Sequence, residues 1–220
     1  MGDRYARLGR LYDVVSLERL LYRRPRARLL ELLGPQPGAT VLDLGCGTGL
    51  DLAGLVRLVG PTGSVIGIDT SASLLAAAER RVARAGWSGV QLLCGDVADV
   101  EGVLHATGVD AGAVTAVVAT FVLSLLPDER PVWAALDELA IRGPLRVAVA
   151  DLGRPDGAPA PARPLLGALT ALGGGDPDRR PWKHVLQRAP DAVHEVHLGG
   201  HVHLAAGTFG TDDAWRSHLT

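Results

Sequence analysis

The chain has 220 residues, of which 47% are hydrophobic, and its formal net charge at pH 7 is −2. This amount of apolar material can bury one sizeable core, so we predict a single domain over residues 1–220. The small net charge leaves no basic excess for a phosphate backbone. This argues against nucleic acid and favours a small molecule as the partner.

The ends of the chain and its apolar runs suggest a cytoplasmic location. The first ten residues include several charged side chains, which predicts no signal peptide. The longest apolar run, 111–126, is shorter than the roughly 20 residues that span a bilayer. We therefore expect a monomer or homodimer without stable membrane insertion. Cys46 and Cys94 lack paired spacing and fall in predicted buried elements, so we expect two buried free thiols.

The first 36 residues are predicted to be helical. Apolar positions recur with a helical period over 5–14, 17–24 and 25–33, and Gly34 with Pro35 ends the last piece. Arginines 23, 24, 26 and 28 fall in this region. We expect them to form a solvated face, unless the ligand carries an anionic head group.

Residues 37–151 alternate between apolar runs typical of buried strands and longer helical patterns. The alternation predicts a doubly wound α/β sheet, mostly parallel, with helices on both faces. The predicted strands are 40–44, 64–69, 90–94, 113–119 and 145–151, and the predicted helices are 49–59, 71–86, 97–106 and 128–139.

The last third of the chain has a different texture. Residues 152–190 are rich in proline and alanine and contain one short apolar helix, so we predict an excursion over the sheet. Residues 191–207 hold two alternating segments around Gly199-Gly200, which predict an antiparallel hairpin. The hairpin would bring the sheet to seven strands.

The most informative segment joins an apolar strand to a glycine-rich turn. Glycines occur at 45, 47 and 49, directly after Asp43, and a helical pattern follows. A dinucleotide fingerprint has the spacing G-x-G-x-x-G, which seats a pyrophosphate at the helix N-terminus. The different spacing, and a carboxylate that would repel phosphate, favour a ligand without a pyrophosphate.

Asp43-Leu44-Gly45-Cys46-Gly47-Thr48-Gly49 resembles the first motif of class I S-adenosylmethionine-dependent methyltransferases. The resemblance implies a Rossmann-like, seven-stranded sheet that ends in the hairpin. It also implies that the turn wraps the methionine part of the cofactor, while Asp43 supports the turn and reaches the cofactor's amino group. S-adenosylhomocysteine would be the product.

The same resemblance assigns further residues to the cofactor. Asp69 follows Gly49 by 20 residues, where an acid can accept both ribose hydroxyls, although a helix-capping role is the alternative. Asp96 matches the position that reads the adenine amino group, with Val97 covering the ring, unless Gly95-Asp96 is only a turn. The residues expected to bind the cofactor are Tyr12, Asp43, Gly45, Cys46, Gly47, Gly49, Asp69, Thr70, Asp96, Val97, Thr120 and Phe121.

The acceptor side is predicted from weaker patterns. Residues 120–127 resemble the family's fourth motif, which borders the transferable methyl, unless Phe121 and the leucines are core. Tyr12-Asp13 and Tyr22-Arg23-Arg24 resemble the N-terminal lid of methyltransferases similar to the ubiquinone/menaquinone-biosynthesis type, or else belong to a packed amphipathic helix. The implied division is a lid over 1–36, a cofactor core over 37–151, an acceptor-side excursion over 152–190 and a hairpin over 191–207.

The implied reaction is in-line displacement of the sulfonium-bound methyl by an N, O or C atom of a small molecule. Leu165, Leu166 and Trp182 hint at a partly apolar acceptor, such as a natural product, a quinone precursor or a lipid amine. Candidate general bases are Tyr12, Asp151 and one C-terminal histidine.

Four histidines occur near the predicted hairpin, at 194, 197, 201 and 203. We expect ordinary strand positions and no metal site. If Gly199-Gly200 is a two-residue turn, alternation places His201 and His203 on one sheet face with His194 and turns His197 to the other.

Two other functions stay open. A nucleotide-dependent oxidoreductase would share Asp69 but lacks the glycine spacing. A protein that binds S-adenosylmethionine for regulation, or for a reaction other than methyl transfer, would share the whole motif.

Overall fold

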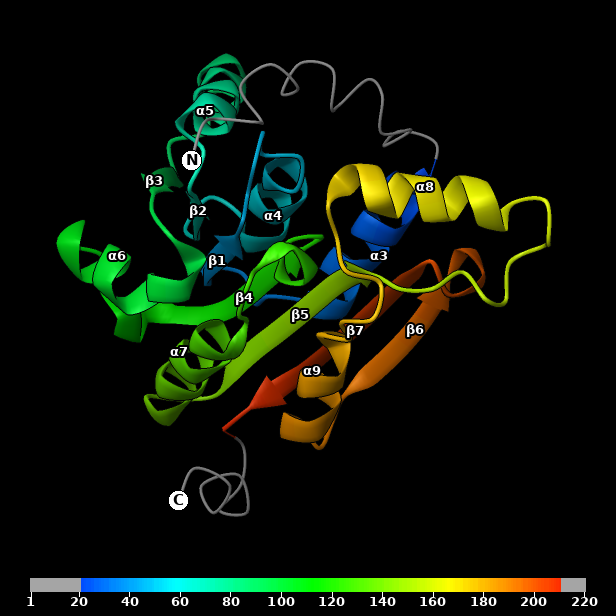
Figure 1. Ribbon diagram of the computed structural model, residues 1–220. Helices are drawn as coiled ribbons and strands as arrows, with labels where there is room; N and C mark the ends of the chain where they lie inside the picture. The colour runs from blue at the N-terminus through cyan, green and yellow to red at the C-terminus, as the bar shows by residue number, and fades with distance from the viewer. Residues whose placement is uncertain (1–20, 211–220) are drawn as a thin grey trace.

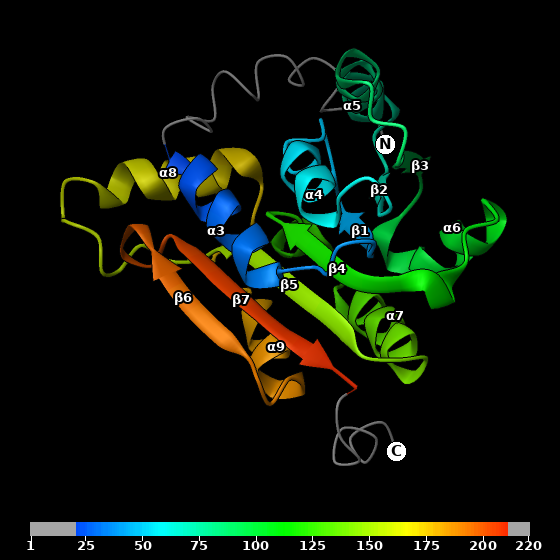
Figure 2. The same cartoon turned by 180° about the vertical axis from the view of Figure 1, so that it is seen from behind.

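A computed structural model describes residues 21–210, which form one seven-stranded sheet with helices on both faces (Figures 1 and 2). The spatial order is β3-β2-β1-β4-β5-β7-β6, in which β7 alone runs antiparallel to its neighbours β5 and β6. The predicted sheet and closing hairpin are thus confirmed. The strands are β1 Thr40–Leu44, β2 Ser64–Asp69, β3 Val90–Cys94, β4 Val114–Thr120, β5 Leu145–Leu152, β6 Val193–His197 and β7 Val202–Phe209.

Two hydrophobic clusters cover the two faces of the sheet, as expected for apolar strands buried on both sides. One face is covered by α3 (Arg23–Leu33), α4 (Leu52–Val59) and α5 (Ala72–Ala85). The other is covered by α6 (Val100–Ala106), α7 (Arg130–Ile141) and α9 (Trp182–Arg188). α8 (Arg163–Gly173) lies beyond the carboxyl ends of the parallel strands (Figure 1).

The strand order reverses between β1 and β4. From β1 the chain moves outward to β2 and β3, then crosses back to place β4 on the other side of β1. Parallel sheets bind ligands outside the carboxyl ends of the strands, at such a switch point. The turn after β1 and the loop after β4 therefore flank the expected crevice.

Several helix boundaries differ from the sequence-based expectation. α4 begins at Leu52 rather than at residue 49, because Gly45, Gly47 and Gly49 all adopt positive φ and extend the turn. α3 runs without a break through Pro25, which lies in the first turn, where a missing N–H costs little. Residues 182–188 form α9, an additional helix within the 152–190 excursion, because Trp182 and Val185 bury one of its sides.

The hairpin also differs in detail. A 3₁₀ turn, η4 (Leu198–Gly200), replaces the predicted two-residue turn, and β7 continues beyond the predicted boundary to Phe209. The remaining 3₁₀ turns are η1 Val97–Asp99, η2 Ala111–Ala113 and η3 Leu123–Leu125. Between residues 21 and 210, no helix has the length and apolar character needed to cross a membrane.

We predict that Leu29→Ala in α3 lowers the free energy of unfolding by about 2–5 kcal/mol, because Leu29 is fully buried and its truncation leaves a cavity. Urea unfolding of the variant measures the change. Leu165→Ala is the matched control, since Leu165 is 56% exposed and its loss should cost less than about 0.5 kcal/mol. Equal losses would contradict the packing of α3 described here.

Candidate cofactor and acceptor site

Polar side chains predicted for the site gather at the carboxyl edge of the sheet. Asp43 is the penultimate residue of β1, Asp69 ends β2 and Thr120 ends β4. Asp96 follows β3, and Asp151 is the penultimate residue of β5. Five strands thus bring residues more than 100 positions apart to one edge. Tyr12 lies outside the described residues.

The glycine turn after β1 is shaped by packing at one position and open at another. A side chain at Gly45 would overlap Val122 of the loop after β4. Gly47 has φ +55°, and the atoms nearest to an added Cβ are Asp69 Oδ2 and Gly45 O, both at 4.0 Å. The crevice is therefore open above Gly47, where a ligand can approach the backbone closely.

The backbone amides of this turn are largely committed to the protein itself. Cys46 N donates to Ile68 O at 3.0 Å, and Gly49 N donates to Cys46 O at 2.9 Å. Gly47 N donates to Asp69 Oδ2 at 2.9 Å. An anion-binding loop presents such amides to phosphate oxygens. Since these amides are already bonded, this turn is poorly suited to a pyrophosphate.

The surroundings of the turn are acidic. Asp43 is 1% exposed, and its Oδ2 has no hydrogen-bond partner among the described residues. Burial, with repulsion from Asp51 second, raises the pKa of Asp43, and attraction to Arg26 opposes the rise. Arg26 Nη1 pairs with Asp51 Oδ2 at 2.8 Å. Asp69 adds a third carboxylate to Asp43 and Asp51, while Arg26 and Arg81, whose Nε donates to Thr48 O at 3.1 Å, are the guanidinium groups described at the turn. The excess of carboxylates favours a cationic ligand.

Asp69 has a structural as well as a candidate binding role. Its Oδ2 accepts from Gly47 N, and its Oδ1 accepts from Ser71 N at 2.8 Å. The cap of α5 itself is Ser71, whose hydroxyl accepts from Leu74 N. Asp69 therefore joins the glycine turn to the start of α5, with further lone pairs on both oxygens for a ligand.

The residues that follow β2 and β3 differ in solvent exposure. Thr70 and Asp96 are exposed, and Asp96 Oδ1 accepts from Ala98 N at 2.9 Å. Val97 is buried in the core, so its side chain packs inside the domain. Cys46 is also buried, and burial raises the pKa of its thiol, whereas Cys94 is exposed and the prediction that it is buried was wrong.

Phe121 occupies a strained position at the crevice. Its φ of +57° is unusual for a bulky residue and costs about 1–2 kcal/mol. The ring meets the edge of Tyr22 with centroids 5.1 Å apart, and the Arg26 guanidinium lies 5.1 Å from its centroid. The neighbouring Thr120 is buried and its hydroxyl lacks a partner among the described residues. Strain of this kind persists where surrounding contacts enforce it.

Asp151 is fully buried beneath the loop after β4. It accepts hydrogen bonds from Ser124 N at 2.9 Å, from Ser124 Oγ at 2.6 Å and from Leu152 N at 2.8 Å. Burial raises the pKa of Asp151 to about 6, although these bonds oppose the rise. The carboxylate is thus engaged in holding the loop.

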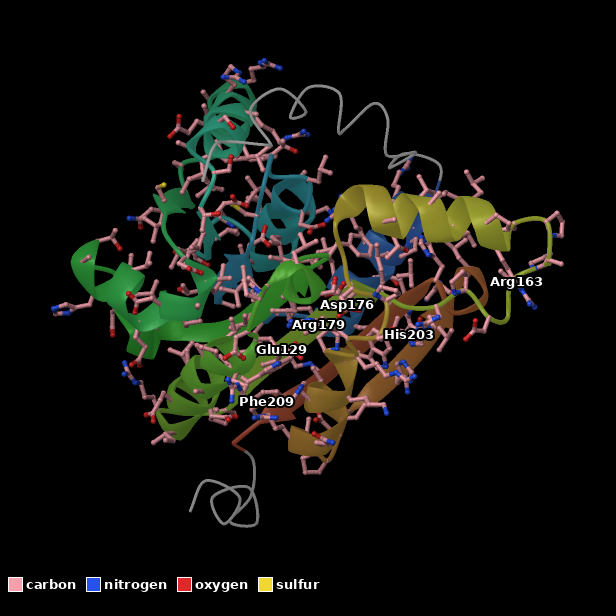
Figure 3. The ribbon with its side chains drawn as sticks, in the orientation of Figure 1. Glu129, Arg163, Asp176, Arg179, His203 and Phe209 are labelled. Carbon is pink, nitrogen blue, oxygen red and sulfur yellow. The ribbon has the colours of Figure 1, made fainter. Side chains whose placement is uncertain are left out.

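The segment before α9 covers the same loop. Asp176 N donates to Ser124 O at 3.2 Å, and Arg179 Nη2 donates to Pro127 O at 2.7 Å. Figure 3 shows Asp176, Arg179 and Glu129 close together in this region. The 152–190 excursion is therefore tied to the loop that borders the crevice.

The histidines of the hairpin fall on both faces. His194 Nε2 and His203 Nδ1 are 3.0 Å apart, and His203 stacks on Trp182 of α9 at 3.9 Å. His201 was predicted to share their face, which is wrong: it is buried on the α3 side, where its Nε2 lies 2.7 Å from Tyr22 Oη. The longer turn ends at His201 in a helical conformation, which breaks the strand alternation. No group of three metal-ligating side chains is found within 21–210.

Other sequence-based interpretations also need correction. Arg26 was expected on a solvated face, but its side chain is only 17% exposed and pairs with Asp51. Leu165, Leu166 and Trp182, which hinted at a partly apolar acceptor, do not form one surface, since Leu165 is exposed and Trp182 packs against the opposite sheet face from α3. Asp51, which was not predicted, lies two residues after the first motif, and Ser124, which was given no role of its own, lies inside the predicted fourth motif.

Comparison with known proteins agrees with this geometry. The family model described as protein-L-isoaspartate(D-aspartate) O-methyltransferase matches residues 24–124. A nocamycin O-methyltransferase of Saccharothrix syringae is 35% identical over 124 residues, which are 56% of this chain and 41% of that protein. A demethylmenaquinone methyltransferase of Staphylococcus aureus is 34% identical over 91 residues, which are 41% of this chain and 36% of that protein. The chain thus spans less than half the length of these relatives.

Solved structures share the fold at lower identity. A S-adenosylmethionine-dependent methyltransferase from Aquifex aeolicus has a TM-score of 0.61 and 18% identity, and the match covers 93% of this chain and 98% of that one. Geranyl diphosphate C-methyltransferase from Streptomyces coelicolor has a TM-score of 0.57 and 16% identity, covering 84% and 74%. By sequence over residues 24–124 and by fold, the chain is similar to class I S-adenosylmethionine-dependent methyltransferases.

Proposed function

We propose that the protein transfers a methyl group from S-adenosylmethionine to an N, O or C atom of a small molecule. One observation carries the proposal: a glycine turn at the sheet's switch point is open above Gly47 but surrounded by carboxylates. The backbone amides of this turn already donate to protein oxygens, so they are poorly placed to bind a pyrophosphate. A ligand with a sulfonium and an ammonium complements the acidic cluster instead.

The residues fit such a cofactor. Asp43, whose buried Oδ2 lacks a partner among the described residues, would accept from the cofactor's ammonium, and Asp69 would accept from ribose hydroxyls. The exposed Asp96 would meet the adenine amino group. Gly47 would let the cofactor approach the backbone. When bound, S-adenosylmethionine supplies a methyl group that is already activated by its positive sulfur.

The protein's part in the reaction is chiefly to position the acceptor. Holding two reacting groups in line can supply about 7–11 kcal/mol. We assign this task to the loop after β4, where Phe121 borders the crevice and Ser124 is fixed by Asp151. Because three hydrogen bonds engage the buried Asp151 carboxylate, we assign Asp151 a positioning role in preference to proton transfer. Tyr12 stays a prediction for the lid.

The small-molecule acceptor is supported by the character of the relatives. One is a nocamycin O-methyltransferase, another a demethylmenaquinone methyltransferase, and a third an arsenite methyltransferase of Halobacterium salinarum. The acceptor would lie between α3 and the 152–190 excursion, because Arg26 of α3 contacts Phe121 and Asp176 bonds Ser124, both in the loop after β4.

The first test is calorimetric titration with S-adenosylmethionine and, separately, with S-adenosylhomocysteine. We expect micromolar binding of both, because the acidic crevice accepts the amino-acid part that they share. An acceptor screen would then follow S-adenosylhomocysteine release. If the folded protein bound neither ligand but bound NADH, the proposed function would be wrong.

We predict that Asp69→Ala weakens S-adenosylhomocysteine binding by roughly 1–3 kcal/mol, because it removes charge-assisted bonds and releases Gly47 N. Calorimetry measures the change. Asp110→Ala is a matched control, since Asp110 makes a similar cap to Gly112 N at the opposite edge of the sheet. An unchanged dissociation constant for Asp69→Ala would refute the assignment.

We predict that Asp151 makes stability rise as the pH falls from about 6 to about 4. Its folded pKa of about 6 lies above its ordinary value of 3.8, so protonation favours the folded state across that window. The difference of about two units corresponds to about 3 kcal/mol at most. Urea unfolding at several pH values gives the free energy of unfolding of wild type and of Asp151→Asn. Plotted against pH, the two curves should differ in slope between about pH 4 and pH 6. Parallel curves would contradict the burial of this carboxylate.

A further inference from the structure

Two imidazole side chains meet on the α9 side of the closing hairpin. Nε2 of His194 in β6 and Nδ1 of His203 in β7 are 3.0 Å apart, and the two rings are within 12° of parallel. His194 is exposed and His203 is half-buried, so solvent reaches the pair. β7 lies three strands away from β1 in the sheet, and neither histidine takes part in the proposed methyl transfer.

The ring of His203 is held in one orientation. Trp182 of α9 stacks on it, with ring centroids 3.9 Å apart and planes within 2° (Figure 3). His203 also donates a hydrogen bond to the backbone carbonyl of Gly200. Since Nδ1 faces His194, this bond comes from Nε2. In the neutral ring Nδ1 therefore carries the lone pair, and the lone pair points at His194.

Both imidazoles are neutral near pH 7. Burial lowers the pKa of His194, and burial, with the neighbouring His194 second, lowers the pKa of His203 to about 4. The bond to Gly200 opposes this effect, and Arg180, which is exposed just before α9, adds to it. In the neutral pair His194 donates its Nε2–H to His203 Nδ1. A single proton therefore separates two ring nitrogens.

This arrangement matches the chemistry of a transition-metal ligand pair. Neutral imidazole nitrogens suit Zn²⁺, Ni²⁺ and Cu²⁺. A histidine that binds a metal commonly donates its other ring N–H to a carbonyl or carboxylate, as His203 does to Gly200. Bonds of about 2.0–2.1 Å in tetrahedral geometry separate two ligand nitrogens by about 3.3 Å, so the pair would have to open by about 0.3 Å. The exposed side chain of His194 can make this movement.

We propose that His194 and His203 bind a divalent transition-metal ion that takes the place of the proton between them. His194 then adopts its Nδ1–H tautomer, so the pair loses no proton, and water fills the remaining coordination positions. The inference is independent of the proposed function. The ion would join β6 to β7 and, through the ring of Trp182, lie against α9 of the 152–190 excursion.

The test is calorimetric titration with Zn²⁺ and with Ni²⁺, using protein without a polyhistidine tag. We expect one ion per chain, and His194→Gln should weaken binding of each ion at least tenfold. His197→Gln is the matched control, because His197 lies on the same strand, faces the other side of the sheet and pairs with Glu195. Its binding should stay within twofold of wild type. Urea midpoints without metal show whether both variants are folded.

A second readout locates the ion by fluorescence. Ni²⁺ has a partly filled d shell and quenches a neighbouring indole, whereas Zn²⁺, a d¹⁰ ion, does not. Ni²⁺ should therefore quench part of the fluorescence of the four tryptophans, with the same dissociation constant as in calorimetry. Trp182→Phe should remove most of this quenching while calorimetric binding stays within threefold.

The contrary results are clear. If wild type showed no saturable binding, or if His194→Gln bound either ion as tightly as wild type, the inference would be overturned. Equal weakening in His194→Gln and His197→Gln would overturn it as well, because the ion would not then distinguish the two faces of β6. Binding of S-adenosylhomocysteine is measured separately, so the proposed function would stand in each case.

Discussion

The site depends on a carboxylate that the fold buries before any ligand arrives. Asp43 belongs to β1, which is paired with β2 on one side and β4 on the other, so its backbone cannot move away from the crevice. Its Oδ2 finds no partner among the described residues, and Asp51 and Asp69 add negative charge. Desolvation of such a group is costly unless positive charge compensates it. Arg26 supplies part of that charge, and a cationic ligand would supply the rest.

The acidic surroundings of Asp43 distinguish this site from dinucleotide-binding sites built on the same kind of sheet. Dinucleotide-binding folds place phosphate at a helix N-terminus, where free amides face the ligand. Here α4 starts only at Leu52, and the amides of Cys46, Gly47 and Gly49 are bonded within the protein. The negative charge of the crevice and the lack of free amide donors in the glycine turn therefore both argue against a nucleotide-dependent oxidoreductase.

The sequence was sufficient for the sheet because its signals are local. Apolar runs predicted the five parallel strands to within one residue at each end, and the glycine spacing located the turn. The sequence was insufficient wherever a contact joins distant segments. The sequence alone presents Arg26 as one of four surface arginines, because its contact with Asp51 depends on how α3 packs. His201 leaves its predicted face because it belongs to the connection Leu198–His201, which replaces the assumed two-residue turn, and not to β7. Helix α9 likewise depends on burial of Trp182, which no local pattern predicts.

The loop after β4 is held by the N-terminal region on one side and by β5 and the 152–190 excursion on the other. Phe121 keeps its strained backbone because Tyr22 and Arg26 of the N-terminal region enclose its ring. Ser124 is fixed from the core by Asp151 and from outside by Asp176. The surfaces that would face an acceptor thus come from segments outside the parallel strands. Substitutions in those segments can change which acceptor is bound without disturbing Asp43 or the glycine turn. A substitution of Ser124 would instead affect both its bond to Asp151 of β5 and its bond to Asp176 of the excursion.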